Sequence, residues 1–257
     1  MSGPIVAVLG LGEAGGSIAT DLVAQGVVTR GFDPEPSRVA AGVERSPSAS
    51  DAVAHAEVVL SVNAQSVAVS VAQSVVGSLT PAHLYADLNT TSAEVKREVA
   101  AAIAPSGAAF VDVALLAPVP GLGLRTPCLV SGSGAERFSA VFGALGMPVE
   151  TLSDVPGDAA TRKLLRSVFM KGLAAAVIES LSAAELAGCE PWLRAQIAAV
   201  IDPSLIDRLV DGSKQHALRR IDEMAAAAAV VADLGLEPHV AVAAAAVLRS
   251  LVDYADL

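Results

Sequence analysis

The sequence predicts an α/β protein, with a Rossmann-type, doubly wound parallel sheet followed by an all-helical C-terminal domain. Three observations support this prediction. Short apolar runs alternate with Ala-rich segments over residues 1–150, and the first run leads directly into a glycine-rich turn at 10–15. After Pro156 and Gly157, long Ala- and Leu-rich segments replace the strand-like runs. We therefore expect a sheet domain at residues 1–156 and a helical domain at residues 157–257.

The strands of the first domain are predicted from short runs rich in Val, Ala and Leu, bounded by Gly, Pro, Ser and Asp. Runs that are apolar on both faces are typical of a parallel sheet covered by helices. The predicted strands are Pro4–Leu9, Val27–Phe32, Val58–Val62, His83–Leu88, Ala109–Val113, Cys128–Ser131 and Pro148–Leu152. The helices predicted between them are Ser17–Gln25, Ser50–His55, Val67–Val76, Ser92–Ile103 and Ala135–Leu145.

The second domain shows helical periodicity without a convincing strand, and Gly or Pro residues end its segments. Its first helix is unusually long, so we expect it to run through the molecule or a subunit interface. The predicted helices are Asp158–Ala187, Pro191–Val200, Ser204–Val210, Lys214–Leu234 and Pro238–Tyr254.

The composition excludes two classes of protein. Of the 257 residues, 53% are hydrophobic and 17% are charged, which excludes a disordered chain. The formal net charge is −10 and aromatic residues make up 3%. The chain therefore lacks the basic surface and the stacking side chains that nucleic-acid binding requires.

Metal, disulfide and membrane sites are not expected. Cys128, Cys189 and the four histidines show neither metal-ligand nor disulfide spacing. The most apolar stretches, such as Ala225–Ala232, are too short to span a bilayer. The first residues lack the basic region of a signal peptide. We expect a cytoplasmic protein without a metal ion.

The turn after the first strand has the pattern GxGxxG. In such a turn the first glycine permits a tight bend, the second lets a pyrophosphate approach the backbone, and the third lets the helix pack on the strand. The helix N-terminus then binds the phosphates. An acidic residue about 20 positions later completes the dinucleotide fingerprint; the alternative is a glycine-rich turn without a ligand. The predicted cofactor contacts here are Gly10, Gly12, Glu13, Ala14, Gly15 and Asp33.

The choice of cofactor depends on Asp33. A carboxylate at this position accepts a hydrogen bond from the ribose 2′-OH of NAD and repels the 2′-phosphate of NADP. Arg30 and Arg38 could still serve NADP. The sequence favours NAD and leaves NADP open, and the alternative for Asp33 is a turn residue before Pro34.

Polar residues also follow two later strands. Asn63 and Thr90 are predicted to contact the cofactor, and Asn89 and Thr90 the substrate, because ligands bind at the carboxyl ends of the strands in such folds. The alternative is that these residues cap helices or form turns.

The long helix carries three polar residues in steps of four: Lys163, Ser167 and Lys171. Each step turns by about 40°, so all three lie within a sector of about 80°. A lysine within an apolar helix is costly unless it is solvated or functional. Lys163 is therefore a candidate catalytic residue with Ser167 beside it, and the alternative is a surface lysine on an amphipathic helix.

These motifs resemble those of the β-hydroxyacid dehydrogenase superfamily, which includes 6-phosphogluconate and 3-hydroxyisobutyrate dehydrogenases. Residues 5–22, IVAVLGLGEAGGSIATDL, resemble its opening; 87–92 resemble its D-x-S-T segment and 110–113 its F-x-D-A segment. Gly157, Lys163 and Ser167 resemble its catalytic helix, with Ser167 where the family has Asn. The resemblance implies NAD(P)-dependent oxidation with Lys163 as the acid–base group, a substrate between the two domains, and a homodimer through the helical domain.

The chain departs from the family after residue 113. The family's P-V-S-G-G loop is absent, so we do not expect a serine there to bind a carboxylate; Leu116 is a predicted substrate contact. Residues 171–180 and 216–224 are similar to a poorly characterised branch described as 6-phosphogluconate dehydrogenase-like. This chain is shorter than true 6-phosphogluconate dehydrogenases, which argues against that substrate.

His216, Arg219 and Arg220 are predicted on one helix, with a shared face at spacings of three and four. Such a cluster could bind the carboxylate or phosphate of a substrate, and the alternative is a surface lattice with neighbouring acidic residues.

The sequence therefore predicts an NAD(P)-dependent oxidoreductase that acts on a small, anionic hydroxy-acid-like substrate. Two alternatives stay open: a pyrroline-carboxylate or imine reductase, and a dinucleotide-binding protein without catalytic activity.

Overall fold

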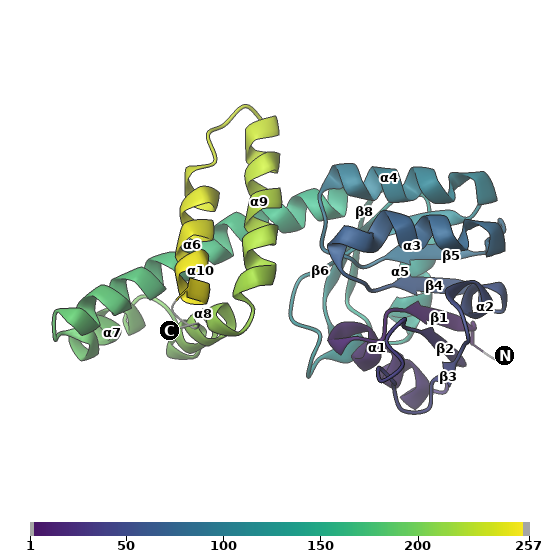
Figure 1. Ribbon diagram of the computed structural model, residues 1–257, viewed down its shortest axis with the longest axis horizontal. Helices are drawn as coiled ribbons and strands as arrows, with labels where there is room; N and C mark the ends of the chain where they lie inside the picture. The colour runs from purple at the N-terminus through teal and green to yellow at the C-terminus, as the bar shows by residue number, and fades with distance from the viewer. Residues whose placement is uncertain (1–2, 254–257) are drawn as a thin grey trace. The chain divides into compact units, whose positions relative to one another are not determined.

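The computed structural model describes residues 3–253 and divides into two compact units, 1–163 and 164–257 (Figure 1). The first unit contains one eight-stranded sheet in the order β3-β2-β1-β4-β5-β6-β7-β8. Every neighbouring pair is parallel except β6 and β7, which are antiparallel. The strands are β1 (Val6–Leu9), β2 (Thr29–Phe32), β3 (Glu44–Arg45), β4 (Val58–Ser61), β5 (Leu84–Asp87), β6 (Ala109–Leu115), β7 (Cys128–Ser131) and β8 (Val149–Ser153).

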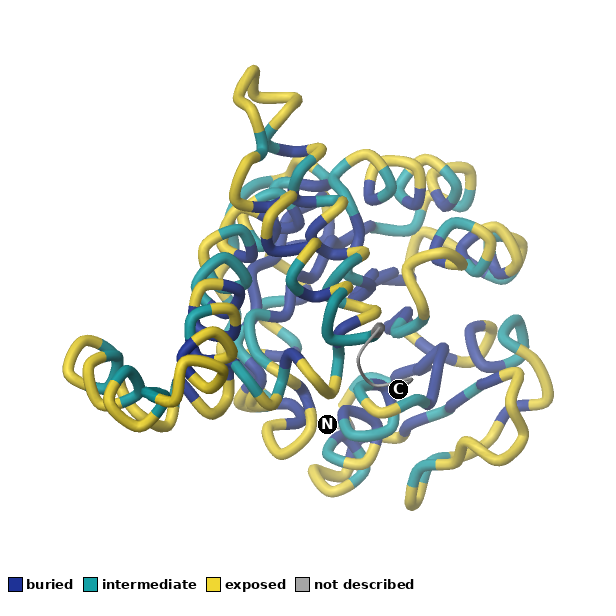
Figure 2. The backbone as a smooth tube through the Cα atoms, turned by 60° about the vertical axis from the view of Figure 1, so that its left-hand side comes forward, coloured by how far each residue is buried: buried dark blue, intermediate teal, exposed yellow. Residues whose placement is uncertain are grey.

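Helices cover both faces of this sheet, because alternate residues of each central strand point to opposite faces. In β1, Val6 and Val8 belong to one apolar core, and Ala7 and Leu9 to another. The helices of the first unit are α1 (Glu13–Ala24), α2 (Ala49–Ala54), α3 (Ala68–Val75), α4 (Ala93–Ile103) and α5 (Ala135–Ala144). α1 and α5 pack in the first core, and α2, α3 and α4 in the second. Figure 2 shows the buried strands beneath the exposed outer turns of the helices.

The doubly wound α/β prediction is confirmed, with two corrections to the sheet. The connection from residue 116 to 127 contains only a 3-10 turn, Gly123–Arg125, so β7 returns antiparallel rather than parallel. A parallel pair requires a longer crossover, usually through a helix. The short strand β3 was not predicted, because its two residues are exposed and show no apolar pattern.

The second unit is helical. α6 (Asp158–Leu186) begins in the first unit and continues into the second. It is followed by α7 (Glu190–Ala198), α8 (Pro203–Gln215), α9 (Ala217–Asp233) and α10 (His239–Asp253). One apolar core joins α6, α9 and α10, and another joins α6, α7 and α8. α9 and α10 form a pair of neighbouring helices (Figure 1). Within the described part of the chain, no helix combines the length and apolar character needed to cross a membrane.

The prediction of one helix from Lys214 to Leu234 is wrong, because the chain leaves helical geometry at His216. Lys214 lies near the end of α8, which extends well beyond the predicted Val210. Gly212 does not end a helix but lies within α8. A Cβ there would lie 2.9 Å from Nη2 of Arg220, so this glycine provides space for a neighbouring side chain.

Candidate active site

The glycine-rich turn lies where β1 and β4 are neighbours, the point at which the strand order reverses. Gly10 has a φ of +99°, and a Cβ there would lie 2.2 Å from the carbonyl oxygen of Val62. A Cβ on Gly15 would lie 1.9 Å from the carbonyl oxygen of Gly10. Only glycine fits these two positions, so strand and helix can approach closely.

Gly12 differs from the other two glycines. Its φ is −66°, and a Cβ there would have Nη1 of Arg38 as its nearest neighbour, at 3.9 Å. The space beside Gly12 is therefore open. Gly12 is also the N-cap of α1 and offers no side chain to the amides of the first turn, which begins with Glu13 and Ala14. Open space and uncapped amides are what a pyrophosphate requires.

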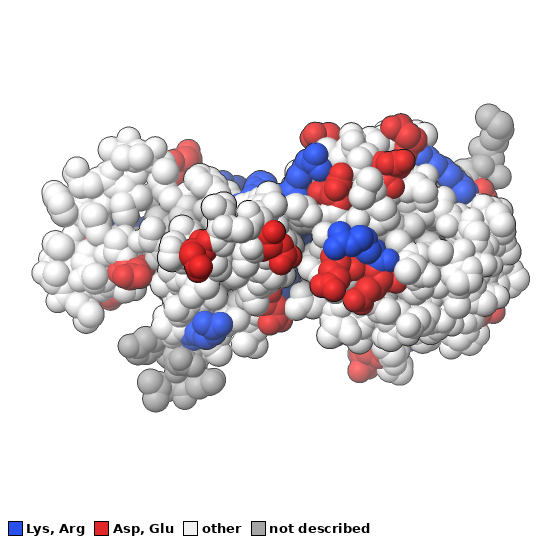
Figure 3. Space-filling model, turned by 90° about the horizontal axis from the view of Figure 1, so that it is seen from above, with Lys and Arg blue, Asp and Glu red and all other residues white. Residues whose placement is uncertain are grey.

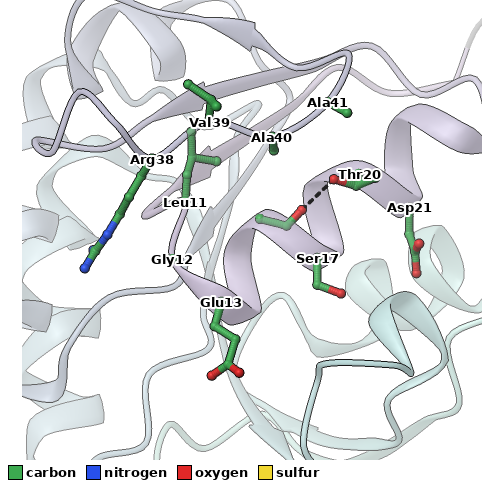
Figure 4. Close-up of a pocket in the computed structure, with 11 residues that line it drawn as sticks. Leu11, Gly12, Glu13, Ser17, Thr20, Asp21, Arg38, Val39, Ala40 and Ala41 are labelled. Carbon is green, nitrogen blue, oxygen red and sulfur yellow. Dashed lines mark hydrogen bonds between the residues drawn. The ribbon is translucent and has the colours of Figure 1, made fainter.

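A groove of about 540 Å³ adjoins this turn (Figure 4). One wall is the first turns of α1 and the other is the segment after β2, which includes Arg38. The groove is lined by Leu11, Gly12, Glu13, Gly16, Ser17, Thr20, Asp21 and residues 38–41. Its position beside an uncapped helix N-terminus fits a phosphate-bearing cofactor.

Asp33 follows β2 and is buried. Its Oδ2 accepts a hydrogen bond from the amide of Leu11 at 2.8 Å, and its Oδ1 accepts one from the amide of Glu35 at 2.9 Å. Nη1 of Arg38 lies 3.6 Å from Oδ2. The carboxylate therefore holds the glycine turn in place. A carboxylate has about four lone-pair positions, so a ribose hydroxyl could still bind.

Asn63 and Asn89 form a polar cluster at the carboxyl ends of β4 and β5. The amide of Asn63 donates to Oδ1 of Asn89 at 2.5 Å, and Nδ2 of Asn63 donates to Oγ of Ser61 at 3.0 Å. Nδ2 of Asn89 donates to Oδ1 of Asp87 at 2.5 Å. Both side chains therefore hold the two loops together, and their contacts with cofactor or substrate stay a prediction.

Lys163 and Thr90 are brought together by the fold of the first unit. Nζ of Lys163 donates to Oγ1 of Thr90 at 2.7 Å. Leu116, the other predicted contact in this unit, follows β6 directly, and its amide donates to the carbonyl oxygen of Pro127 at 2.8 Å.

The start of α6 is held by two strand residues. Oδ2 of Asp112 accepts from the amide of Ala160 at 2.9 Å, and Oγ of Ser131 accepts from the amide of Ala159 at 3.1 Å. A carboxylate at a helix N-terminus is favoured by the helix dipole. These contacts fix the turn of α6 that precedes Lys163.

A buried ion cluster joins α4 to the ends of β5 and β6. It was not predicted from the sequence. Nζ of Lys96 lies 3.1 Å from both Oδ2 of Asp87 and Oδ1 of Asp112, and it donates to the carbonyl oxygen of Asp87 at 2.8 Å. All three residues are at most 1% exposed. Burial acts to lower the pKa of Lys96, but the two carboxylates outweigh it and the pKa is raised. Lys96 is therefore charged and ties together the ends of β5 and β6.

The helical unit contains a second polar cluster, formed by Ser167, Lys171 and Glu223. The hydroxyl of buried Ser167 donates to Oε1 of Glu223, and Nζ of Lys171 lies 2.9 Å from the same oxygen. Burial lowers the pKa of Lys171, and Glu223 offsets this only in part. Ser167 and Lys171, which helical spacing placed on one face, therefore share the carboxylate of Glu223.

His216, Arg219 and Arg220 do not form the shared helix face that was predicted. His216 lies between α8 and α9, so the spacing rule for one helix does not apply to it. Arg219 is exposed, whereas Arg220 is half-buried and donates from Nη1 to Oγ of Ser213 at 2.6 Å.

Comparison with known proteins is consistent with this geometry. Residues 5–146 match the model of the NAD binding domain of 6-phosphogluconate dehydrogenase. Residues 184–251 match a domain of unknown function. Over 132 residues the chain is 34% identical to a probable 3-hydroxyisobutyrate dehydrogenase of Mycobacterium tuberculosis, a match that covers 49% of this chain and 45% of that protein. The match thus spans about half the length of this curated relative.

Two solved structures share the fold over nearly the whole chain. A conserved hypothetical protein from Sinorhizobium meliloti 1021 is 30% identical with a TM-score of 0.77, and the alignment covers 97% of this chain and 88% of that one. The 3-hydroxyisobutyrate dehydrogenase of Mycobacterium tuberculosis, solved with L-serine, has a TM-score of 0.81 at 24% identity, with 98% and 94% covered. The first unit is thus an NAD-binding domain, and the chain belongs to the family defined by the NAD-binding domain of 6-phosphogluconate dehydrogenase.

Proposed function

We propose that the protein is an NAD(P)-dependent oxidoreductase that interconverts the CH–OH and carbonyl groups of a small hydroxy-acid-like substrate, with Lys163 as the general acid–base. The contact between Lys163 and Thr90 carries this proposal. Thr90 follows β5, and the glycine turn follows β1, in a sheet where β1, β4 and β5 are parallel. The amine therefore lies at the same edge of the sheet as the phosphate-binding turn, where ligands of such folds bind.

In the proposed reaction the cofactor supplies hydride transfer, and the protein supplies proton transfer. A nicotinamide cofactor held by the glycine turn and Asp33 would supply the hydride acceptor for oxidation and the hydride donor for reduction. In oxidation, the neutral amine of Lys163 takes the hydroxyl proton as the hydride leaves; in reduction, its ammonium donates a proton to the carbonyl oxygen. Thr90 directs the amine by accepting one of its hydrogen bonds, and Asp112 holds the start of α6.

A substrate screen tests the proposed activity. Hydroxy acids are offered with NAD⁺ or NADP⁺, oxo acids with NADH or NADPH, and cyclic imines with NADH or NADPH, while absorbance of the reduced cofactor is followed. Turnover of hydroxy or oxo acids supports the proposal. Turnover of imines alone would favour an imine reductase, and tight cofactor binding without any turnover would favour a non-catalytic dinucleotide-binding protein.

Gly12→Val is expected to weaken binding of NAD and NADP by more than about tenfold while the domain stays folded. The backbone at Gly12 is extended and has space for a side chain, but that side chain would occupy the position of the pyrophosphate. Fluorescence titration with NADH measures the affinity and circular dichroism measures the fold. Gly143→Val, on an open position of α5, is the control. Unchanged NADH affinity in Gly12→Val would contradict a cofactor site at this turn.

Arg38→Gln is expected to lower affinity for NADP by roughly fivefold, equivalent to about 1 kcal/mol, and to change affinity for NAD little. Arg38 is exposed and lies beside Asp33, where the ribose 2′ position is recognised in this fold, so its charge acts on a 2′-phosphate. Parallel titrations with NADPH and NADH measure the difference. Arg30→Gln is the control, because its guanidinium is bound to Glu44 at 2.5 Å. Equal losses for both cofactors in Arg38→Gln would refute this role.

We further propose that the helical unit forms a homodimer. Large apolar side chains are exposed on it, among them Phe169, Leu186, Trp192, Val200 and Leu218. The face of this unit in Figure 3 is mostly uncharged. Extended uncharged surface of this kind is typical of contacts between subunits, and light scattering after gel filtration measures the mass in solution.

A further inference from the structure

Arg220, in α9 of the helical unit, makes defined contacts with Ser213 and Gly212. The proposed reaction does not involve this side chain. Nη1 donates to Oγ of Ser213 at 2.6 Å, and that hydroxyl donates to the carbonyl oxygen of Leu209 at 2.6 Å. Ser213 is completely buried. Nη2 lies where a Cβ on Gly212 would be only 2.9 Å away. The guanidinium is thus held on one side by a serine of fixed orientation and by a glycine that leaves it room.

Within residues 3–253, no carboxylate lies in ion-pair contact with Arg220. Burial lowers the pKa of Arg220, and the electrostatic effect of Glu223 opposes this without reversing it. A cation that is partly removed from water without a carboxylate partner raises the free energy of the folded state. Binding of an anion would recover that free energy.

Lys171 adds a second cation nearby. Burial lowers the pKa of Lys171, Glu223 opposes this effect, and the positive charge of Arg220 lowers the pKa further. The side chain of Lys171 is 17% exposed. Lys171 and Arg220 together carry two positive charges against the single carboxylate of Glu223, which also accepts from Ser167. Two cations and one carboxylate of the described residues thus meet here, in a chain whose formal net charge is −10.

We propose that Arg220 and Lys171 form an oxyanion-binding site within the helical unit, which takes a small carboxylate or phosphate. A guanidinium offers two parallel N–H donors to an oxyanion, and the ammonium adds a point charge. Both cations lie in the helical unit, on α6 and α9, so this binding does not depend on the proposed oxidoreductase activity.

Isothermal titration with inorganic phosphate, and separately with acetate, tests the site in the full-length protein at constant ionic strength. We expect saturable, millimolar binding to the wild type that weakens by about tenfold or more in Arg220→Gln. Acetate binding without phosphate binding would identify a carboxylate site, and the reverse a phosphate site. Arg208→Gln, an exposed arginine on α8, is the matched control and should bind as the wild type does.

Two further variants control for phosphate bound elsewhere and for misfolding of Arg220→Gln. Phosphate held at the glycine turn would be lost in Gly12→Val and kept in Arg220→Gln, which is the opposite of the expected pattern. Lys171→Met weakens binding without touching Ser213 or Gly212, so it tests the site if Arg220→Gln fails to fold. Absence of saturable binding to the wild type, or equal loss in Arg208→Gln, would overturn the proposal. Arg220-dependent binding without turnover of any substrate would retain the oxyanion site and refute the oxidoreductase.

Discussion

Lys163→Met is expected to lower kcat by roughly 10²- to 10⁴-fold, the usual contribution of a general acid–base group. Methionine keeps much of the aliphatic stem of Lys163 and removes the amine that contacts Oγ1 of Thr90. Without that amine, no group at this position can take the hydroxyl proton as the hydride leaves. Steady-state kinetics with the substrate found in the screen measures kcat.

Cofactor affinity separates this effect from damage to the fold. NADH titration should give a Kd within about twofold of the wild type, because the glycine turn and Asp33 are untouched. Arg162→Gln is the matched control: it removes an adjacent, exposed cation of α6 whose partner is Asp158. Lys163→Arg keeps the positive charge but cannot exchange a proton near neutral pH, so it should be as inactive as Lys163→Met. An active Lys163→Met variant would remove Lys163 from the mechanism.

The sequence predicted most of the sheet because the central strands are short, apolar and bounded by turn residues. β1, β4 and β5 end within two residues of their predicted positions. The direction of β7 could not be predicted from apolar pattern, since a buried strand has the same pattern in either direction. The absence of a predicted helix between β6 and β7 was nevertheless an indication, because a parallel return usually requires one.

The candidate site was predictable where its residues are neighbours in sequence and unpredictable where sheet order brings them together. The glycine turn and the acidic residue after β2 form one local motif. Lys96 instead depends on two strands, β5 and β6, being adjacent. One indication of its burial was present: Lys96 lies on the same face of α4 as Val99 and Ile103, at spacings of three and seven. The break at His216 was missed because the sequence placed it near Gly212, a residue type that usually ends a helix, whereas Gly212 lies within α8.

Lys96→Met is expected to lower the free energy of unfolding by about 3–5 kcal/mol at neutral pH, the usual cost of removing one partner from a buried ion pair. The variant leaves the carboxylates of Asp87 and Asp112 buried without a cation. It also removes the donor to the carbonyl oxygen of Asp87. Urea unfolding followed by circular dichroism measures the change, and hydrogen exchange at β5 and β6 locates it. Lys214→Met, at an exposed position of α8, is the control.

The pH dependence of this loss distinguishes buried charge from lost packing. Burial already raises the pKa of Asp87 in the wild type, and removal of Lys96 takes away the opposing cation, so the pKa rises further. A carboxylate whose pKa is higher in the folded than in the unfolded state destabilises the fold as pH rises through that range. The difference between wild type and Lys96→Met should therefore be larger at pH 8 than at pH 5. Asp87→Asn combined with Lys96→Met should recover part of the loss, because one buried charge is gone. A loss that is independent of pH, with no recovery in the double variant, would show that Lys96 contributes through packing of its aliphatic stem alone.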